Sequence, residues 1–165
     1  MLRGELKAAL DLLDNPSSLR AIRIRAESLE GLGRAEEAGR VLQPLVDRLR
    51  AEQLRSSEDL VEGVRGLMIR SQVLPQQEPA GGVFKRMAPL LARARDRLGR
   101  FYWPAYVAEA GLLSDKDNPK EAGPTAMRSL TLNPSAAAAW SFLGRVAVDT
   151  FNFDGAEQAA LRLKK

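Results

Sequence analysis

The chain has 165 residues, of which 45% are hydrophobic, and its 25 basic and 21 acidic residues give a net charge of +4. It contains no cysteine and no histidine, so disulfides and thiolate chemistry are excluded, and the commonest general base and metal ligand is missing. The mixed charge falls short of that of a typical nucleic-acid-binding domain.

No apolar run in the sequence approaches the roughly 20 residues of a membrane-spanning helix. The N-terminal stretch MLRGELKAALDLLD has neither the apolar segment nor the cleavage site of a signal peptide. The sequence leaves the location unknown, with the cytoplasm as the default expectation, because the chain can be a fragment of a longer protein.

Apolar residues recur at helical spacing along the whole chain, and no run alternates in the manner of a β-strand. Gly, Pro and Asn residues separate the helical segments. The sequence therefore predicts an all-α fold with about nine helices. In chain order we expect them at residues 3–13, 18–31, 34–54, 57–73, 81–98, 101–114, 119–131, 135–149 and 153–164. The stretch PQQEPAGG at 75–82 is expected to be a loop.

The chain resembles itself after a shift of 34 residues. Only nine residues are aromatic (two Trp, two Tyr and five Phe), so an aromatic that aligns with another aromatic is informative. A fixed period of this length indicates repeated helix–turn–helix units. The aligned pairs are Tyr106 with Trp140, Ala110 with Gly144, Ala122 with Ala156 and Ala126 with Ala160.

This pattern, together with AIRIRAESLEGLGRAEEAGRVLQPL near the start, resembles the tetratricopeptide repeat (TPR) family. The resemblance implies a TPR-like α-solenoid, a right-handed superhelix of antiparallel helix hairpins. Small residues such as Gly144 and Ala156 would mark where the two helices of a hairpin touch. The resemblance divides the chain, taken as a single array, into a trailing half repeat at 1–17, repeats at 18–56, 101–134 and 135–165, and a degenerate repeat at 57–100 with the loop at 75–82.

The resemblance also implies a concave groove lined by the first helix of each hairpin. Chaperone-binding members of the family grip a terminal carboxylate with Lys and Asn at groove positions, and neither residue stands there in this chain. Arginines at these positions would instead hold an acidic partner through charge-assisted hydrogen bonds. The alternative is solvated charge that pairs with its neighbours, since Arg23 and Glu27 are four residues apart. The candidate partner-binding residues are Arg20, Arg23, Glu27, Val107, Ser141 and Arg145.

The stretch KRMAPLLARARDRLGR at 85–100 holds six basic residues and one acid. It suggests a nucleic-acid-binding or membrane patch, but a solvated outer helix face explains it more simply. The aromatic run Phe101, Tyr102 and Trp103 follows. We expect most of this run to pack between units, and an aromatic that stays exposed would be a binding anchor.

The sequence contains no Gly-rich phosphate loop, nucleophile elbow or metalloprotease motif, and we expect no catalytic, cofactor or metal site. The predicted function is a non-catalytic protein–protein interaction scaffold that binds a partner protein or peptide in the groove. The alternative is a regulatory or spacer TPR segment of a larger multidomain enzyme whose active site lies outside this chain. Homo-oligomers through the terminal hairpins are also expected, because Phe153, Ala156, Ala160 and Leu163 lie near one face of the last helix.

Overall fold

The computed structural model describes residues 3–76, 80–115 and 118–164. All regular elements within these ranges are helices, which confirms the all-α prediction, and they include nine α-helices. The chain divides into two compact units, Met1–Leu90 and Leu91–Lys165.

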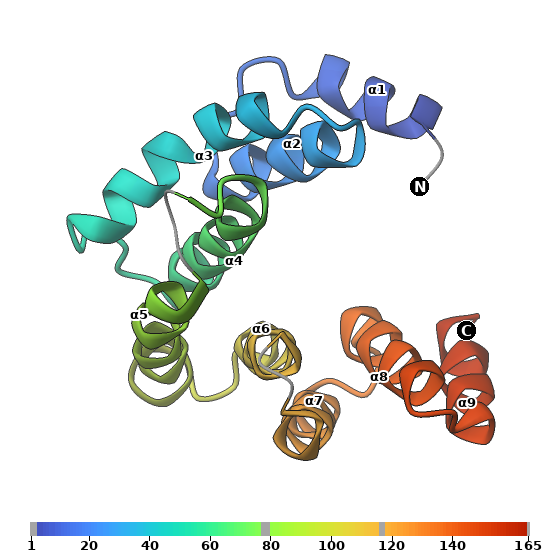
Figure 1. Cartoon of the computed structure of the whole chain (residues 1–165). Coiled ribbons are helices and arrows are strands. Elements are labelled where there is room, and N and C mark those ends of the chain that lie inside the picture. Colours follow the sequence, from blue (N-terminus) through green and yellow to red (C-terminus); the bar gives the residue numbers. More distant parts are fainter. Residues whose placement is uncertain (1–2, 77–79, 116–117, 165) are drawn as a thin grey trace. The chain divides into compact units, whose positions relative to one another are not determined.

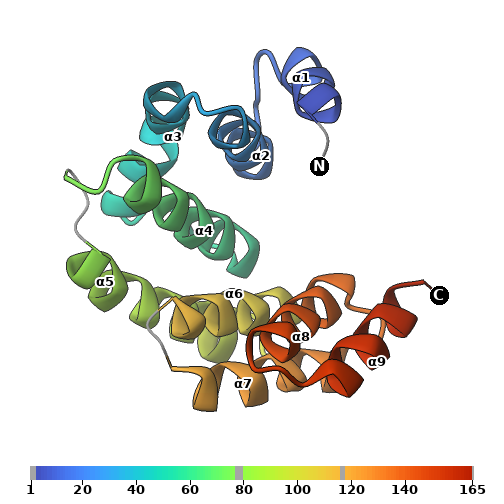
Figure 2. The same cartoon turned by 45° about the vertical axis from the view of Figure 1, so that its right-hand side comes forward.

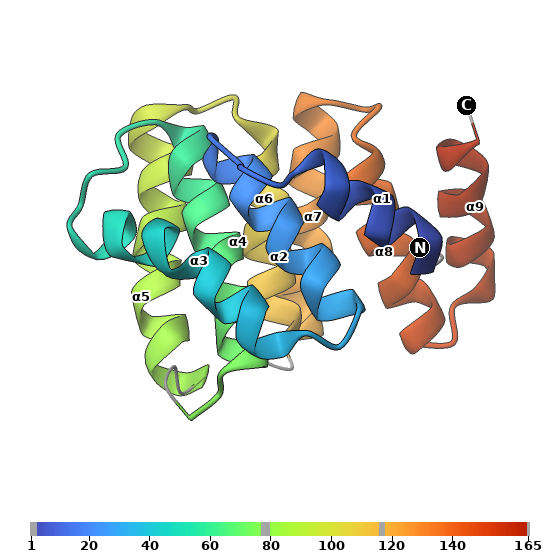
Figure 3. The ribbon, with the colours of Figure 1, turned by 90° about the horizontal axis from the view of Figure 1, so that it is seen from above.

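The first unit contains α1 (Arg3–Leu12), α2 (Leu19–Gly31), α3 (Ala35–Arg50), α4 (Ser57–Val73) and most of α5 (Ala80–Arg93). Helix α1 packs on α2, and α2, α3 and α4 pack on one another (Figures 1 and 3). The core of this unit is built from the apolar positions that recur at helical spacing. Its buried members include Ile22, Ala26, Leu29, Ala38, Leu42, Leu45, Val46, Leu60, Val64 and Leu67.

Local signals fix the helix ends in this unit. The hydroxyls of Ser18 and Ser56 accept hydrogen bonds from the amides of Ala21 and Asp59 at 3.1 and 3.0 Å, so each serine caps the helix that follows it. Gly33, with φ of +77°, makes the turn after α2, and its amide donates to the Glu30 carbonyl at 2.8 Å. A glycine adopts this left-handed conformation without a steric penalty.

Helix α3 ends at Arg50, whereas the sequence predicted a helix to residue 54. Glu52 has a φ of +53°, which turns the chain out of the helix. Leu54 is then buried against α4, where a Cβ added to Gly63 would lie 2.7 Å from a Leu54 methyl carbon. The early end of α3 thus allows Leu54 to be buried, which removes its apolar surface from water.

The second unit contains the end of α5, its π-helical continuation η1 (Ala94–Leu98), α6 (Trp103–Ser114), α7 (Pro119–Leu132), α8 (Ala137–Asp149) and α9 (Phe153–Leu163). Helix α6 packs on α7, α7 on α8, and α8 on α9 (Figures 1 and 2). One core cluster joins Val107, Leu130, Ala136 and Ala139, and another joins Ala110, Ala122, Ala126 and Phe142.

Two further predictions differ from the structure: the loop expected at 75–82 and the helix expected at 101–114. Helix α5 begins at Ala80, so part of the predicted loop is helical, and residues 77–79 of that loop lie outside the described residues. Helix α6 begins at Trp103 because residues 99–102 form a turn, in which the Tyr102 amide donates to the Gly99 carbonyl at 2.8 Å. Pro104 then stands in the first turn of α6, where no intrahelical amide bond is lost.

The alanines of α7 and α9 that the 34-residue shift aligns differ in burial. Ala122 and Ala126 of α7 are fully buried, because α7 lies between α6 and α8. Their counterparts Ala156 and Ala160 in α9 are half-buried and exposed. Among the described residues α9 packs on α8 alone, and the buried small residue of α9 is Ala159.

Candidate functional site

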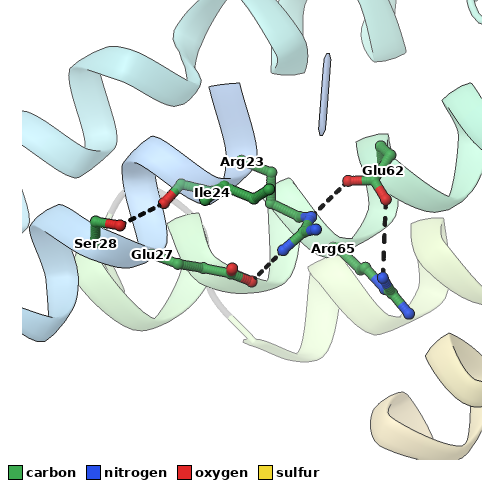
Figure 4. Close-up of polar contacts among 6 residues, drawn as sticks. All are labelled: Arg23, Ile24, Glu27, Ser28, Glu62 and Arg65. Carbon is green, nitrogen blue, oxygen red and sulfur yellow. Dashed lines mark hydrogen bonds and ion pairs between the residues drawn. The ribbon is translucent and has the colours of Figure 1, made fainter. Parts of the chain in front are cut away.

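The first candidate surface, on α2, is organised by the buried cation Arg23. Only 8% of Arg23 is exposed. Its Nε donates to Oε2 of Glu62 in α4 at 2.5 Å, and its Nη1 donates to Oε1 of Glu27 at 2.5 Å (Figure 4). Arg65 stands on the other side of Glu62, with 3.8 Å between its Nη1 and Oε1. This cluster ties α2 to α4 through charge-assisted hydrogen bonds.

Electrostatics strengthen this connection. Burial acts to lower the pKa of Arg23, but the carboxylates of Glu27 and Glu62 outweigh burial, so the pKa is raised overall. The guanidinium is therefore permanently charged, and its charge is matched within the fold. Arg23 thus has a structural role in the ion-pair cluster, while its contact with a partner stays a prediction.

The same face of α2 also presents groups to solvent. Arg20 is exposed, and 46% of the Glu27 side chain is accessible. Glu30 is half-buried, and its pKa is raised, first by burial and then by the nearby charge of Glu27. Arg20 is therefore the accessible cation among the predicted partner-binding residues of this unit.

The second candidate surface lies on α8. Ser141 and Arg145 are exposed, and Val107 of α6 is buried in the core cluster that includes Leu130. Of the three predicted residues of this unit, Val107 is therefore buried in the core, and Ser141 and Arg145 lie at the surface. The exposed face of α8 comprises Ala138, Ser141, Arg145 and Val148, at intervals of three, four and three residues.

Arg145 has an accessible guanidinium that lies 5.5 Å from the centre of the Phe142 ring. This is a cation–π geometry, which orients the group without neutralising it. Arg145 makes no ion pair within the part of the chain that the structure describes. Burial raises the pKa of Asp115, and the charge of Arg145 opposes that shift, so the two groups sense each other.

The basic stretch 85–100 is partly neutralised where it reaches η1. Arg95 donates from Nε and Nη2 to the two carboxylate oxygens of Asp96 at 2.7 and 2.9 Å, and it also pairs with Glu109 of α6. Its guanidinium lies 5.6 Å from the centre of the Tyr106 ring. The hydrogen bonds to Asp96 contribute most to a raised pKa of Arg95. This pairing weakens the case for a polycationic surface.

Three aromatic side chains of the described residues are exposed: Phe101, Phe151 and Phe153. Phe101 is 81% exposed, whereas Trp103 of the same run packs against the core cluster of Val107. Phe101 is therefore the exposed aromatic of this run, and its use as a binding anchor stays a prediction. Phe151, also 81% exposed, was not singled out from the sequence, although its place between two helical segments marks it as a turn residue.

Within the described ranges, no three side chains among Asp and Glu lie close enough together to hold a metal ion. No helix of those ranges combines the length and apolar character that a bilayer crossing requires. The described residues thus form a helical protein that exposes arginine and aromatic side chains. No family model matches the sequence, and no curated protein matches it either.

Proposed function

We propose that the protein is a non-catalytic interaction scaffold of the TPR type, in which helix hairpins stack into a right-handed superhelix and a partner segment binds along their first helices. The hairpins α2–α3, α6–α7 and α8–α9 are pairs of sequence-adjacent helices that pack on each other, as this proposal requires. Fully buried alanines at Ala26 and Ala38, and at Ala110 and Ala122, support a repeated small-residue contact.

The observation that carries the proposal is the state of Arg145. The exposed guanidinium lies against the Phe142 ring and forms no ion pair with a described residue, so its hydrogen-bond donors can serve another molecule. Ser141 precedes it by one helical turn and is also exposed. The partner segment therefore carries at least one carboxylate, which an arginine binds through paired hydrogen bonds.

In the first unit, Arg20 offers a second exposed arginine that can bind a carboxylate of the partner. It is exposed on α2, three residues before Arg23, whose ion pair with Glu62 ties α2 to α4. A scaffold needs positions of this kind on regular helices, because a fixed backbone lowers the entropy lost on binding. In this proposal the partner binds through noncovalent contacts alone at both surfaces.

A selection of random displayed peptides on the full chain tests the proposal. We expect the selected peptides to be enriched in Asp and Glu, and Arg145→Glu to weaken their binding by about 10- to 100-fold, the range for a hydrogen bond to a charged group. Arg128→Glu is the matched control, because Arg128 is exposed on α7 and undergoes the same charge change. Equal binding to both variants would remove the α8 face from the proposal.

A further inference from the structure

The turn between α8 and α9 exposes a cluster of apolar side chains. Phe151 is 81% exposed, Phe153 is 67% exposed, and their rings meet edge to face with 6.4 Å between centres. Val148, in the last turn of α8, is 53% exposed. We call Val148, Phe151 and Phe153 the aromatic turn. Large aromatic side chains kept in water forgo the stabilisation that burial of their surface would give.

The backbone of Phe151 points to a use for this exposure. Its φ is +57°, in the left-handed region that glycine or asparagine ordinarily occupies at a helix end. Its amide donates to the Val148 carbonyl at 3.0 Å, and the Asn152 amide donates to the Ala147 carbonyl at 2.8 Å, so the turn is well formed. A bulky aromatic residue at this position is strained, and such strain is concentrated at binding sites. Folding alone would be served better by glycine.

The other end of the same hairpin carries an open pocket of about 340 Å³. Its walls are Trp140, Gln158, Leu161 and Arg162, and the Arg162 guanidinium lies 5.7 Å from the centre of the Trp140 ring. We call this the Trp140 pocket. Its aromatic and aliphatic walls suit an inserted aromatic ring, with the arginine at the edge.

The aromatic turn does not fill the Trp140 pocket of its own chain. Phe153 begins α9 and Arg162 lies nine residues further along that helix, which corresponds to roughly 14 Å of helix axis. A second hairpin that lies antiparallel to the first places each aromatic turn beside the other's pocket. A twofold axis makes both contacts at once and closes the assembly as a dimer.

Charges support this antiparallel arrangement. The exposed carboxylate of Asp149 lies within the span of the aromatic turn and that of Asp154 directly follows it. The exposed cations Arg162 and Lys164 stand at the pocket end of α9. The antiparallel pair brings acids next to bases at both ends, whereas a parallel pair brings like charges together.

We infer that a second copy of this chain is the occupant of the Trp140 pocket: Phe151 and Phe153 of each copy dock at the pocket of the other, forming a twofold homodimer. Asp154 of each copy pairs with Arg162 of its partner. This dimer surface shares Val148 with the exposed face of α8 assigned to a partner segment, and its other residues lie in the turn, on α9 and at Trp140.

Sedimentation equilibrium over a concentration series, combined with thermal unfolding, tests the inference. We expect the full chain to dimerise, and Phe151→Gly to weaken dimerisation at least tenfold while leaving the thermal midpoint of the monomer unchanged or raised by about 2–4 °C, since strain is relieved. Asp154→Arg and Arg162→Asp should each weaken the dimer, and the variant with both changes should restore it. Arg128→Asp on α7 is the matched control and should leave dimerisation unchanged.

A chain that stays monomeric at about 1 mM would overturn the inference, because that concentration detects even weak association. A dimer that persists in Phe151→Gly and in Asp154→Arg would also overturn it, since the interface would then lie elsewhere. The double charge reversal guards against loss of fold, because a misfolded hairpin would not regain dimerisation.

Discussion

Gly144 of α8 lies against Ala159 of α9, so closely that a Cβ added to the glycine would be 3.2 Å from the alanine Cβ. The two helices of this hairpin touch at a pair of small residues, as the sequence suggested for Gly144. The partner of the glycine is Ala159, whereas the repeat pattern had predicted Ala156. The contact sets how near the axes of α8 and α9 can come, and it leads to the first prediction.

Gly144→Val should destabilise the chain by about 1–3 kcal/mol, because the added methyl groups force α8 away from Ala159. Chemical denaturation monitored by circular dichroism measures the change. Ala160→Val is the control on the exposed side of α9, and it should cost about 0.5 kcal/mol through helix propensity alone. Equal losses in the two variants would show that the contact does not limit packing.

Glu62→Gln should destabilise the chain by about 3–5 kcal/mol, because it leaves the buried Arg23 without one of its carboxylates. The matched control is Glu37→Gln, which breaks the exposed pair with Arg34 at 2.7 Å and should cost much less, because water screens an exposed pair. Urea titrations of the two variants give the comparison. A loss no larger at Glu62 than at Glu37 would contradict the structural role of the Arg23 cluster.

Glu30→Gln should stabilise the chain at neutral pH. Burial, assisted by Glu27, raises the pKa of Glu30 in the folded state, so ionised Glu30 costs stability above that pKa. The advantage of glutamine should be complete above the raised pKa, should shrink as the pH falls through it, and should vanish below the ordinary value of 4.5. Thermal midpoints across this pH range, with the exposed Glu157→Gln as control, provide the measurement. An advantage independent of pH would exclude titration of Glu30 as its cause.

Ser18→Ala should destabilise the chain by about 1 kcal/mol, since the Ser18 hydroxyl accepts the hydrogen bond of the Ala21 amide at the start of α2. Ser17→Ala changes the neighbouring exposed serine and should have almost no effect. For a chain of this length the capping loss corresponds to a fall of about 2–4 °C in thermal midpoint. If the two variants melt together, Ser18 does not cap α2.

The sequence by itself determined the helical class and most of the helix positions. Helix periodicity is a local property, and turn-forming pairs such as Asn133 and Pro134 mark helix boundaries in the local sequence. The early end of α3 could not be read in this way, because it depends on Leu54 finding a buried site on α4.

Tertiary structure alone decided which candidate residues are accessible. Arg20, Arg23 and Arg145 are equivalent as sequence, yet Arg23 is buried because Glu62, 39 residues later, meets its guanidinium across α2 and α4. Val107 is buried for the same kind of reason, since α7 and α8 supply its neighbours. Burial and pairing depend on contacts between residues distant in the chain, and no local pattern specifies them.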